Sequence, residues 1–219
     1  MSNVGLLYVG AVLLVNGLML LGLVPPRSAA GINLFVGALQ CVTPVVLIVQ
    51  AGHDREAILA ASGLFLFGFT YLYVGIANLA GLEPQGIGWF SLFVSGAAVI
   101  YAGLSFWHTA DPVFGVIWLA WALLWFLFFL VLGLGRERLT RFTGWAVVLL
   151  SQPTCTVPAF FSLTGGYRSN ATIAMIAAAL AVLLVAVAAL LGFRGVEARS
   201  EARSETRSET GAVVDGAST

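Results

Sequence analysis

The fold is decided by residues 112–134, PVFGVIWLAWALLWFLFFLVLGL, a run of 23 residues without a charged side chain. About 20 apolar residues in a helix span the hydrocarbon core of a bilayer. Six more runs of this character occur along the chain, at residues 4–24, 31–50, 58–81, 88–107, 143–164 and 171–193. The sequence therefore predicts an all-α integral membrane protein with seven transmembrane helices.

The composition agrees with that prediction and excludes several classes of protein. Hydrophobic residues make up 60% of the chain and charged residues 9%, whereas charged residues make up about a quarter of a soluble domain. The formal net charge is zero, so the charge balance favours no nucleic-acid partner. Cys41 and Cys155 lie inside apolar runs, which predicts small buried residues rather than a disulfide framework or a metal site. We expect no metal and no cofactor.

The arginines in the short connections between the runs predict an orientation. Eight of the ten arginines lie in alternate connections and in the C-terminal tail, and Arg55 and Arg168 lie on the opposite side. By the positive-inside rule the N-terminus is outside and the C-terminus is cytoplasmic, in the plasma membrane. The first run has no charged segment before it and no small-residue cleavage site after it, so we expect a retained helix rather than a signal peptide.

The C-terminal tail has a different character from the rest of the chain. Residues 197–209, EARSEARSETRSE, repeat with a period of four, so that a helix would stack arginine over arginine and glutamate over glutamate. A solvated, disordered cytoplasmic tail over residues 195–219 is the prediction, and a docking segment is the alternative.

The seven runs contain no Asp, Glu, Lys, Arg or His. Pumps and proton-coupled carriers place such residues in the membrane, so their absence predicts passive movement of a neutral solute, or no transport. An enzyme is not expected, because the runs offer neither a general base nor a metal-binding cluster. The histidines, His53 and His108, lie in external connections. Solvated loop residues are the simpler interpretation, and external pH sensing is the alternative.

The run at residues 112–134 carries a stripe of aromatic side chains. Trp118, Trp121 and Trp125 follow the spacing i, i+3, i+7 and share one helix face, which Phe114 extends. The stripe lies too deep for the tryptophan belt of a membrane interface. Each indole N–H needs an acceptor that lipid cannot provide, so the stripe should face protein or a cavity. Plain core packing is the alternative interpretation.

Two other runs present comparable faces. They consist of Leu6, Val9, Leu13 and Asn16 in the first run, and of Phe67, Tyr71 and Asn78 in the third. Together the three faces would line a path for a flat, small, uncharged solute that forms hydrogen bonds. The aromatic rings would set its width, and Tyr71 and Asn16 would replace some lost water contacts. An ion would find no compensating charge there.

Small residues and prolines predict how the helices pack. Glycine pairs seven residues apart give the first, third and fourth spans a narrow face for close helix contact. These pairs are Gly10 and Gly17, Gly68 and Gly75, and Gly96 and Gly103. Prolines, which interrupt the helical hydrogen bonds, predict kinks in the second and sixth spans, at Pro44, Pro153 and Pro158.

Several motifs surround these faces. They are GLLYVG at 5–10, NG at 16–17, NLFVG at 33–37, FGFTYLY at 67–73, WFSLFV at 89–94, IWLAW at 117–121, LW at 124–125, and FT at 142–143 with Trp145. In combination, over residues 4–164, they resemble the AmiS/UreI family of urea channels and short-chain amide transporters.

The resemblance implies a six-helix channel domain over residues 1–164 that has its own pore and assembles as a homo-hexamer. It also implies passive conduction of urea, acetamide or formamide toward a cytoplasmic amidase or urease. The family's constrictions correspond here to Leu6, Val9, Leu13, Asn16, Phe67, Tyr71, Trp118, Trp121, Leu124 and Trp125. These positions coincide with the three faces derived from helical spacing.

The chain also departs from the family pattern. Phe114 stands where the family has an additional tryptophan, and Leu150 stands where it has a glutamate. The histidine-bearing loops of acid-gated members are short here, which favours an amide transporter over an acid-activated urea channel. The seventh span, over residues 165–194, has no counterpart in six-span members, and we expect it at the periphery of the protomer.

Two other functions remain open from the sequence. A structural or assembly protein would use the aromatic stripe only to pack helices. An alternating-access carrier would move the same neutral amides with saturable kinetics and counterflow.

Overall fold

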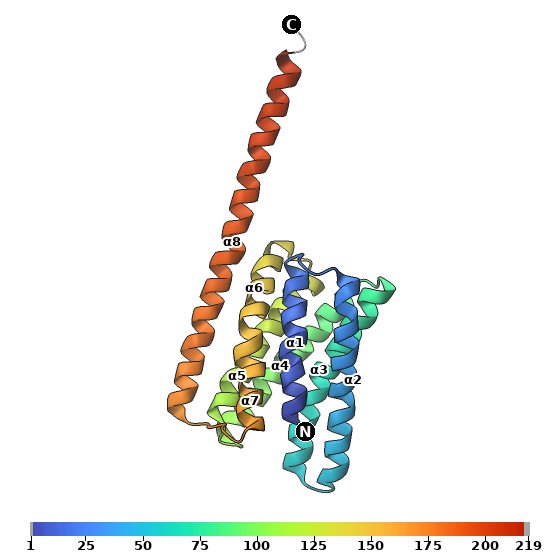
Figure 1. Cartoon of the computed structure of the whole chain (residues 1–219), viewed down its shortest axis with the longest axis vertical. Coiled ribbons are helices and arrows are strands. Elements are labelled where there is room, and N and C mark those ends of the chain that lie inside the picture. Colours follow the sequence, from blue (N-terminus) through green and yellow to red (C-terminus); the bar gives the residue numbers. More distant parts are fainter. Residues whose placement is uncertain (1, 217–219) are drawn as a thin grey trace.

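The computed structural model describes the backbone of residues 2–216 and the side chains of residues 3–194. Seven helical segments in it are long and apolar enough to cross a membrane. Six of them form one bundle, and the seventh lies along its outside (Figure 1). The predicted all-α membrane fold is therefore confirmed.

The helices follow one another along the chain with short turns between them. Their bounds are α1 Ser2–Leu20, α2 Pro26–Ala51, α3 Arg55–Ala80, α4 Gln85–Trp107, α5 Pro112–Phe128, α6 Thr140–Ser151, α7 Val157–Leu163 and α8 Ala171–Gly216. A π-helical turn, Phe129–Gly133, continues α5, and a second one, Gln152–Thr156, joins α6 to α7. A short 3-10 turn, Glu137–Leu139, precedes α6.

The ends of these helices are set by side-chain caps, glycines and prolines. Asp54 caps α3 by accepting hydrogen bonds from the N–H groups of Glu56 and Ala57, and Asp111 caps α5 in the same way. The predicted first span, 4–24, is too long, because α1 already ends at Leu20. Gly22 adopts a left-handed φ of 78° just after it, and two prolines follow at the start of α2.

The helices alternate in direction, so their connections gather at two ends of the bundle (Figure 1). One end, which we call the N-terminal end, carries the start of α1 and the connections at residues 52–54, 108–111 and 164–170. The other end, which we call the arginine end, carries the starts of α2 and α6 and therefore most of the arginines of the bundle. That the arginine end faces the cytoplasm stays a prediction.

Gly10 and Gly17, the first predicted glycine pair, bring α1 close to the sixth span. A Cβ atom on Gly17 would lie 2.9 Å from the backbone nitrogen of Val148 and 3.0 Å from the carbonyl oxygen of Gly144. Gly10 meets Thr156 of the second π-helical turn in the same way. Backbones approach this closely in membrane bundles only where side chains are absent.

The second glycine pair likewise packs α3 against α2. A Cβ atom on Gly68 would lie 3.0 Å from the carbonyl oxygen of Gln40, and one on Gly75 would lie 3.2 Å from that of Ala30. The third pair makes no such contact with another helix of the protomer. Gly96 has nothing within 4 Å of such an atom, and Gly103 meets only Trp107 of its own helix.

The prolines act differently in the two spans that contain them. Helix α2 continues through Pro44, whereas the sixth span changes to the π-helical turn that contains Pro153. Gln152 is the first residue of this turn, and its side chain donates to the carbonyl oxygen of Gly10 at 3.1 Å. The irregular backbone of the sixth span is thus turned toward α1 rather than toward lipid.

Helix α8 packs on the outside of the bundle against α5 and α6, at the predicted periphery (Figure 1). The rings of Phe142 and Phe193 stack at 5.6 Å, and Gly192 lies against the backbone of Phe142. The backbone of residues 195–216 continues α8. The sequence pattern predicts a solvated tail there. The side chains of this stretch lie outside the described residues, and a disordered tail stays a prediction.

Substitution of Gly17 by Ala tests the close contact of α1 with α6. We expect a loss of about 1–3 kcal/mol in stability, because the new Cβ atom meets backbone that cannot turn aside. Thermal unfolding of the detergent-solubilised protein, followed by tryptophan fluorescence, measures the change.

The matched control is Gly96→Ala, which adds the same methyl group where nothing lies within 4 Å. It should keep or slightly raise the unfolding temperature, since alanine favours a helix by up to about 1 kcal/mol over glycine. Equal unfolding temperatures for the two variants would contradict the close packing of α1 on α6.

Candidate functional site

Two cavities lie inside the six-helix bundle, one toward each end. The first has a volume of about 240 Å³ and is lined at the N-terminal end by Asn3, Glu56, His108 and Asp111. The second has a volume of about 80 Å³ and reaches Leu20, Asn78 and Pro84 near the arginine end. Since a cavity of roughly 10–15 Å³ holds one water molecule, both have room for a small solute.

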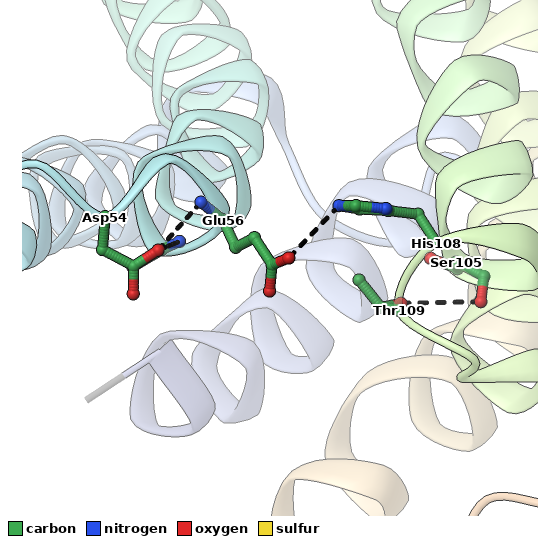
Figure 2. A network of polar contacts seen from close by, with 6 residues as sticks. Asp54, Glu56, Ser105, His108 and Thr109 are labelled. Atoms are coloured by element: carbon green, nitrogen blue, oxygen red, sulfur yellow. Dashed lines mark hydrogen bonds and ion pairs between the residues drawn. The ribbon is translucent and has the colours of Figure 1, made fainter.

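The rim of the first cavity is polar. Figure 2 shows Glu56, at the start of α3, pointing toward His108, at the end of α4, with Oε1 and Nε2 separated by 3.5 Å. Both side chains are at least half exposed, so water screens this pair. His53 lies exposed in the turn before α3. External pH sensing by His53 or His108 stays a prediction.

The deep wall of the first cavity is apolar and aromatic. It is formed by Leu6 and Val9 of α1, Phe67 of α3, and Trp118 and Trp121 of α5. Tyr101 of α4 stacks on Trp118 with the ring centroids 4.7 Å apart. A solute that enters from the N-terminal end therefore passes from charged groups to ring faces.

A buried layer of side chains separates the two cavities. Leu13, Leu124 and Trp125 are fully buried, and Phe67 and Trp121 are 3% and 2% exposed. The ring of Phe67 lies 4.9 Å from that of Trp121 and 5.1 Å from that of Trp125, both edge to face. The predicted faces of the third and fifth spans thus meet at Phe67. We use the name aromatic layer for the three rings together with two leucines: Phe67, Trp121, Trp125, Leu13 and Leu124.

Two of the three indole N–H groups of the predicted stripe, those of Trp121 and Trp125, find acceptors within the protein. Trp121 donates to Oγ1 of Thr154 at 3.1 Å, and Trp125 donates to Oγ1 of Thr70 at 3.2 Å. Each threonine donates its own hydroxyl proton to a carbonyl oxygen one turn earlier in its helix, at 2.7 Å. Neither threonine was predicted from the sequence, although a hydroxyl within an apolar run signals a buried hydrogen bond.

The second cavity holds the polar groups that were expected to meet a solute, with one correction. The hydroxyl group of Tyr71 is buried and has no hydrogen-bond partner. The amide of Asn16, in contrast, is paired with that of Asn33 by two hydrogen bonds of 2.9 and 2.7 Å. Asn16 therefore joins α1 to α2 with one N–H and one lone pair of its amide, and only the rest of the amide is left for a solute.

The structure distributes the predicted residues over three levels. Leu6, Val9, Phe67, Phe114, Trp118 and Trp121 line the first cavity, and Asn16, Tyr71 and Trp125 line the second. Leu13, Leu124 and Leu150 are fully buried and line neither cavity; Leu13 follows Val9 and precedes Asn16 on α1, and Leu124 lies between Trp121 and Trp125 on α5. That these residues share one path through the bundle, and that they act as constrictions, stay predictions.

A carboxylate at the rim of the first cavity organises the connection before α8, which was not foreseen from the sequence. Asp111 accepts hydrogen bonds from the hydroxyl groups of Tyr167 at 2.8 Å and Ser169 at 2.6 Å, besides the N–H of Phe114 at 3.0 Å. Burial, and next the hydrogen bond to Asp111, raise the pKa of Tyr167 above its ordinary value, so Tyr167 remains a neutral donor.

Substitution of Asp111 by Ala should remove both the cap of α5 and the anchor of this connection. We expect a loss of stability toward the upper part of the usual range for a helix cap, about 0.5–2 kcal/mol. We also expect faster tryptic cleavage after Arg168, which lies in the released connection. Thermal unfolding and timed proteolysis in detergent measure the two effects.

The control is Asp54→Ala, which removes a cap of the same kind from α3, where the Asp54 side chain accepts from the N–H groups of Glu56 and Ala57 and ties down no other connection. It should destabilise less and leave cleavage after Arg168 unchanged. Cleavage there at the wild-type rate in Asp111→Ala would contradict the anchoring role.

Comparison with known proteins places the chain in a defined context. The model of the AmiS/UreI family, described as a family of transporters, matches residues 1–166. This match covers the six-helix bundle and leaves α8 outside.

The individual relatives are named as transporters or as a channel. The chain is 71% identical over 185 residues to AmiS2 of Rhodococcus erythropolis, which is named a transporter protein, with 84% of this chain and 90% of the relative covered. A protein of Mycolicibacterium smegmatis named as a transporter of amidate substrates is 52% identical, with 84% and 88% covered. The cryo-electron microscopy structure of the Helicobacter pylori urea channel in a closed state superposes with a TM-score of 0.69 at 33% identity, covering 77% of this chain and all of the channel.

Proposed function

The chain belongs to the AmiS/UreI family of transporters, and from this we propose that it is a passive channel for small neutral amides such as urea, acetamide and formamide. It is a multi-pass protein of the plasma membrane. The observation that carries the proposal is the pair of cavities on one path, separated by a single uncharged layer of rings and leucines.

The chemistry of the path suits a neutral solute. Glu56, His108 and Asp111 stand only at the rim of the first cavity, and the residues that line the second cavity carry no formal charge. An ion stripped of water in the aromatic layer would meet no opposite charge, which is costly in a membrane. A flat amide loses less on leaving water and stacks against the ring faces.

The aromatic layer has fixed and free members. Trp121 and Trp125 are tied by their N–H groups to Thr154 and Thr70, whereas Leu13 and Phe67 are held by packing alone. We therefore expect the layer to open by displacement of Leu13 and Phe67 between the tethered indoles. Such an opening suits a small planar solute better than a hydrated one.

The proposal extends to assembly and to a metabolic partner. It includes a homo-hexameric ring in which each protomer has its own pore and α8 stays outside the path. It includes the predicted orientation, with the arginine end in the cytoplasm, where an amidase or urease consumes the amide. The names of the relatives support an amide or urea as the solute.

Purified protein in liposomes should accelerate the entry of acetamide, formamide and urea without ionic conductance. Stopped-flow light scattering measures the swelling of the vesicles, and a conductance measurement on the same protein supplies the ion control. The physical reason is the uncharged path, which lowers the barrier for neutral amides alone.

Swelling no faster than in empty liposomes would contradict the channel and favour a structural or assembly role. Saturable uptake with counterflow would instead identify an alternating-access carrier. Linear dependence of the rate on amide concentration at high concentration is the result expected of the channel.

Substitution of Tyr71 by Phe tests whether the second cavity contacts the solute. The Tyr71 hydroxyl has no partner in the protein, so its removal should leave the unfolding temperature unchanged. We expect acetamide flux to fall about two- to tenfold, the effect of one lost hydrogen bond to the solute.

The control is Tyr73→Phe, on the same helix but outside the lining of either cavity. It should conduct like the wild type. Wild-type flux in Tyr71→Phe as well would reassign Tyr71 to packing.

A further inference from the structure

A glutamine in the wall of the first cavity has no role in the function described so far. Gln40 lies in the middle of α2, and its side chain is 1% exposed. It lines the first cavity together with Leu6 and Val9. Its side-chain oxygen Oε1 is buried without a hydrogen-bond partner. Since an unpaired buried amide oxygen is unfavourable, a partner from the cavity itself would satisfy it.

The surrounding helices hold the Gln40 amide in this place. Gly68 of α3 packs against the backbone of Gln40, where a Cβ atom would lie 3.0 Å from its carbonyl oxygen. On the other side, Gly5 of α1 leaves the space in which Oε1 lies, and a Cβ atom there would collide with Oε1. Gly68 therefore lets α3 approach the backbone at Gln40, and Gly5 leaves room for the side-chain carboxamide.

We infer that Gln40 is a specificity-determining residue that binds the carboxamide group of the solute in the first cavity, before the aromatic layer. A primary amide or urea presents a carbonyl oxygen and an N–H on the same edge. When the end of the Gln40 side chain turns from Gly5 toward the cavity, the solute forms two hydrogen bonds with its amide, by donating to the oxygen and accepting from an N–H of the nitrogen. The inference rests on the proposed function and adds to it the chemical group that is recognised.

This pairing predicts a preference that size alone does not produce. N-methylacetamide in its stable trans form carries its N–H on the edge opposite to the carbonyl oxygen, so it cannot form both bonds at once. The extra methyl group also slows it in the aromatic layer. That size effect is the same in every variant with an unchanged layer. A change in the ratio of acetamide to N-methylacetamide flux between the wild type and a variant therefore measures the contribution of Gln40.

The experiment measures this ratio in liposomes for the wild type and for Gln40→Met, which keeps the length of the side chain and removes the amide. We expect the ratio to fall about threefold or more, as for a site that loses a polar contact to its substrate. Tryptophan fluorescence and size-exclusion profiles select folded protein.

The matched control is Ser95→Ala, which removes a buried hydroxyl that bonds to the carbonyl oxygen of Ala122. Its ratio should equal that of the wild type.

A second variant displaces the amide without removing it. In Gly5→Ala the new methyl group pushes the end of the Gln40 side chain aside, so the ratio should fall here too. In the double variant Gly5→Ala with Gln40→Met, the change at Gly5 should have no additional effect on the ratio, because both changes act through one amide.

The outcomes separate this inference from the proposed function. If the wild type conducts acetamide and folded Gln40→Met keeps the wild-type ratio, the inference is wrong and the channel stands. Equal slowing of both solutes in Gln40→Met would also overturn the inference, since it indicates packing rather than recognition. If the wild type conducts neither solute, the proposed function fails and the inference fails with it.

Discussion

The two indole N–H groups at the centre of the bundle must be satisfied where no water is available, and the arrangement of the helices depends on how this is done. Trp121 bonds to Thr154 and Trp125 bonds to Thr70, so that α5 is tied to the sixth span and to α3. The reciprocal pair of Asn16 and Asn33 ties α1 to α2. In lipid, burial of apolar surface does not distinguish one helix contact from another, so such bonds fix the partners.

Close backbone packing completes what the hydrogen bonds begin. The contact of α1 with α6 at Gly17 and the contact of α2 with α3 at Gly68 leave no room for a Cβ atom. Room inside the bundle is left in the two cavities, where large side chains from α1, α3 and α5 meet without filling the space.

Much of the fold was predictable from the sequence, and the failures have one physical cause. Helical spacing shows which side chains share a face, so the stripe of Trp118, Trp121 and Trp125 and its meeting with Phe67 could be foreseen. Spacing does not say which face of another helix lies opposite. For that reason the pairing of Asn16 with Asn33 was missed, and it could not be foreseen that Gly96 makes no close contact within the protomer. The anchoring of Tyr167 by Asp111 joins residues 56 positions apart and was equally hidden.

The unpaired polar atoms of the path stand on opposite sides of the aromatic layer. Gln40, whose Oε1 has no partner in the protein, lines the first cavity, and Tyr71, whose hydroxyl group has none, lines the second. In the proposed channel a solute therefore meets a hydrogen-bonding group before and after the rings, but none within them. A neutral amide tolerates this short gap, since it loses a few hydrogen bonds for the length of one ring layer. An ion would lose its whole hydration shell there, so the layer selects by the cost of desolvation as well as by width.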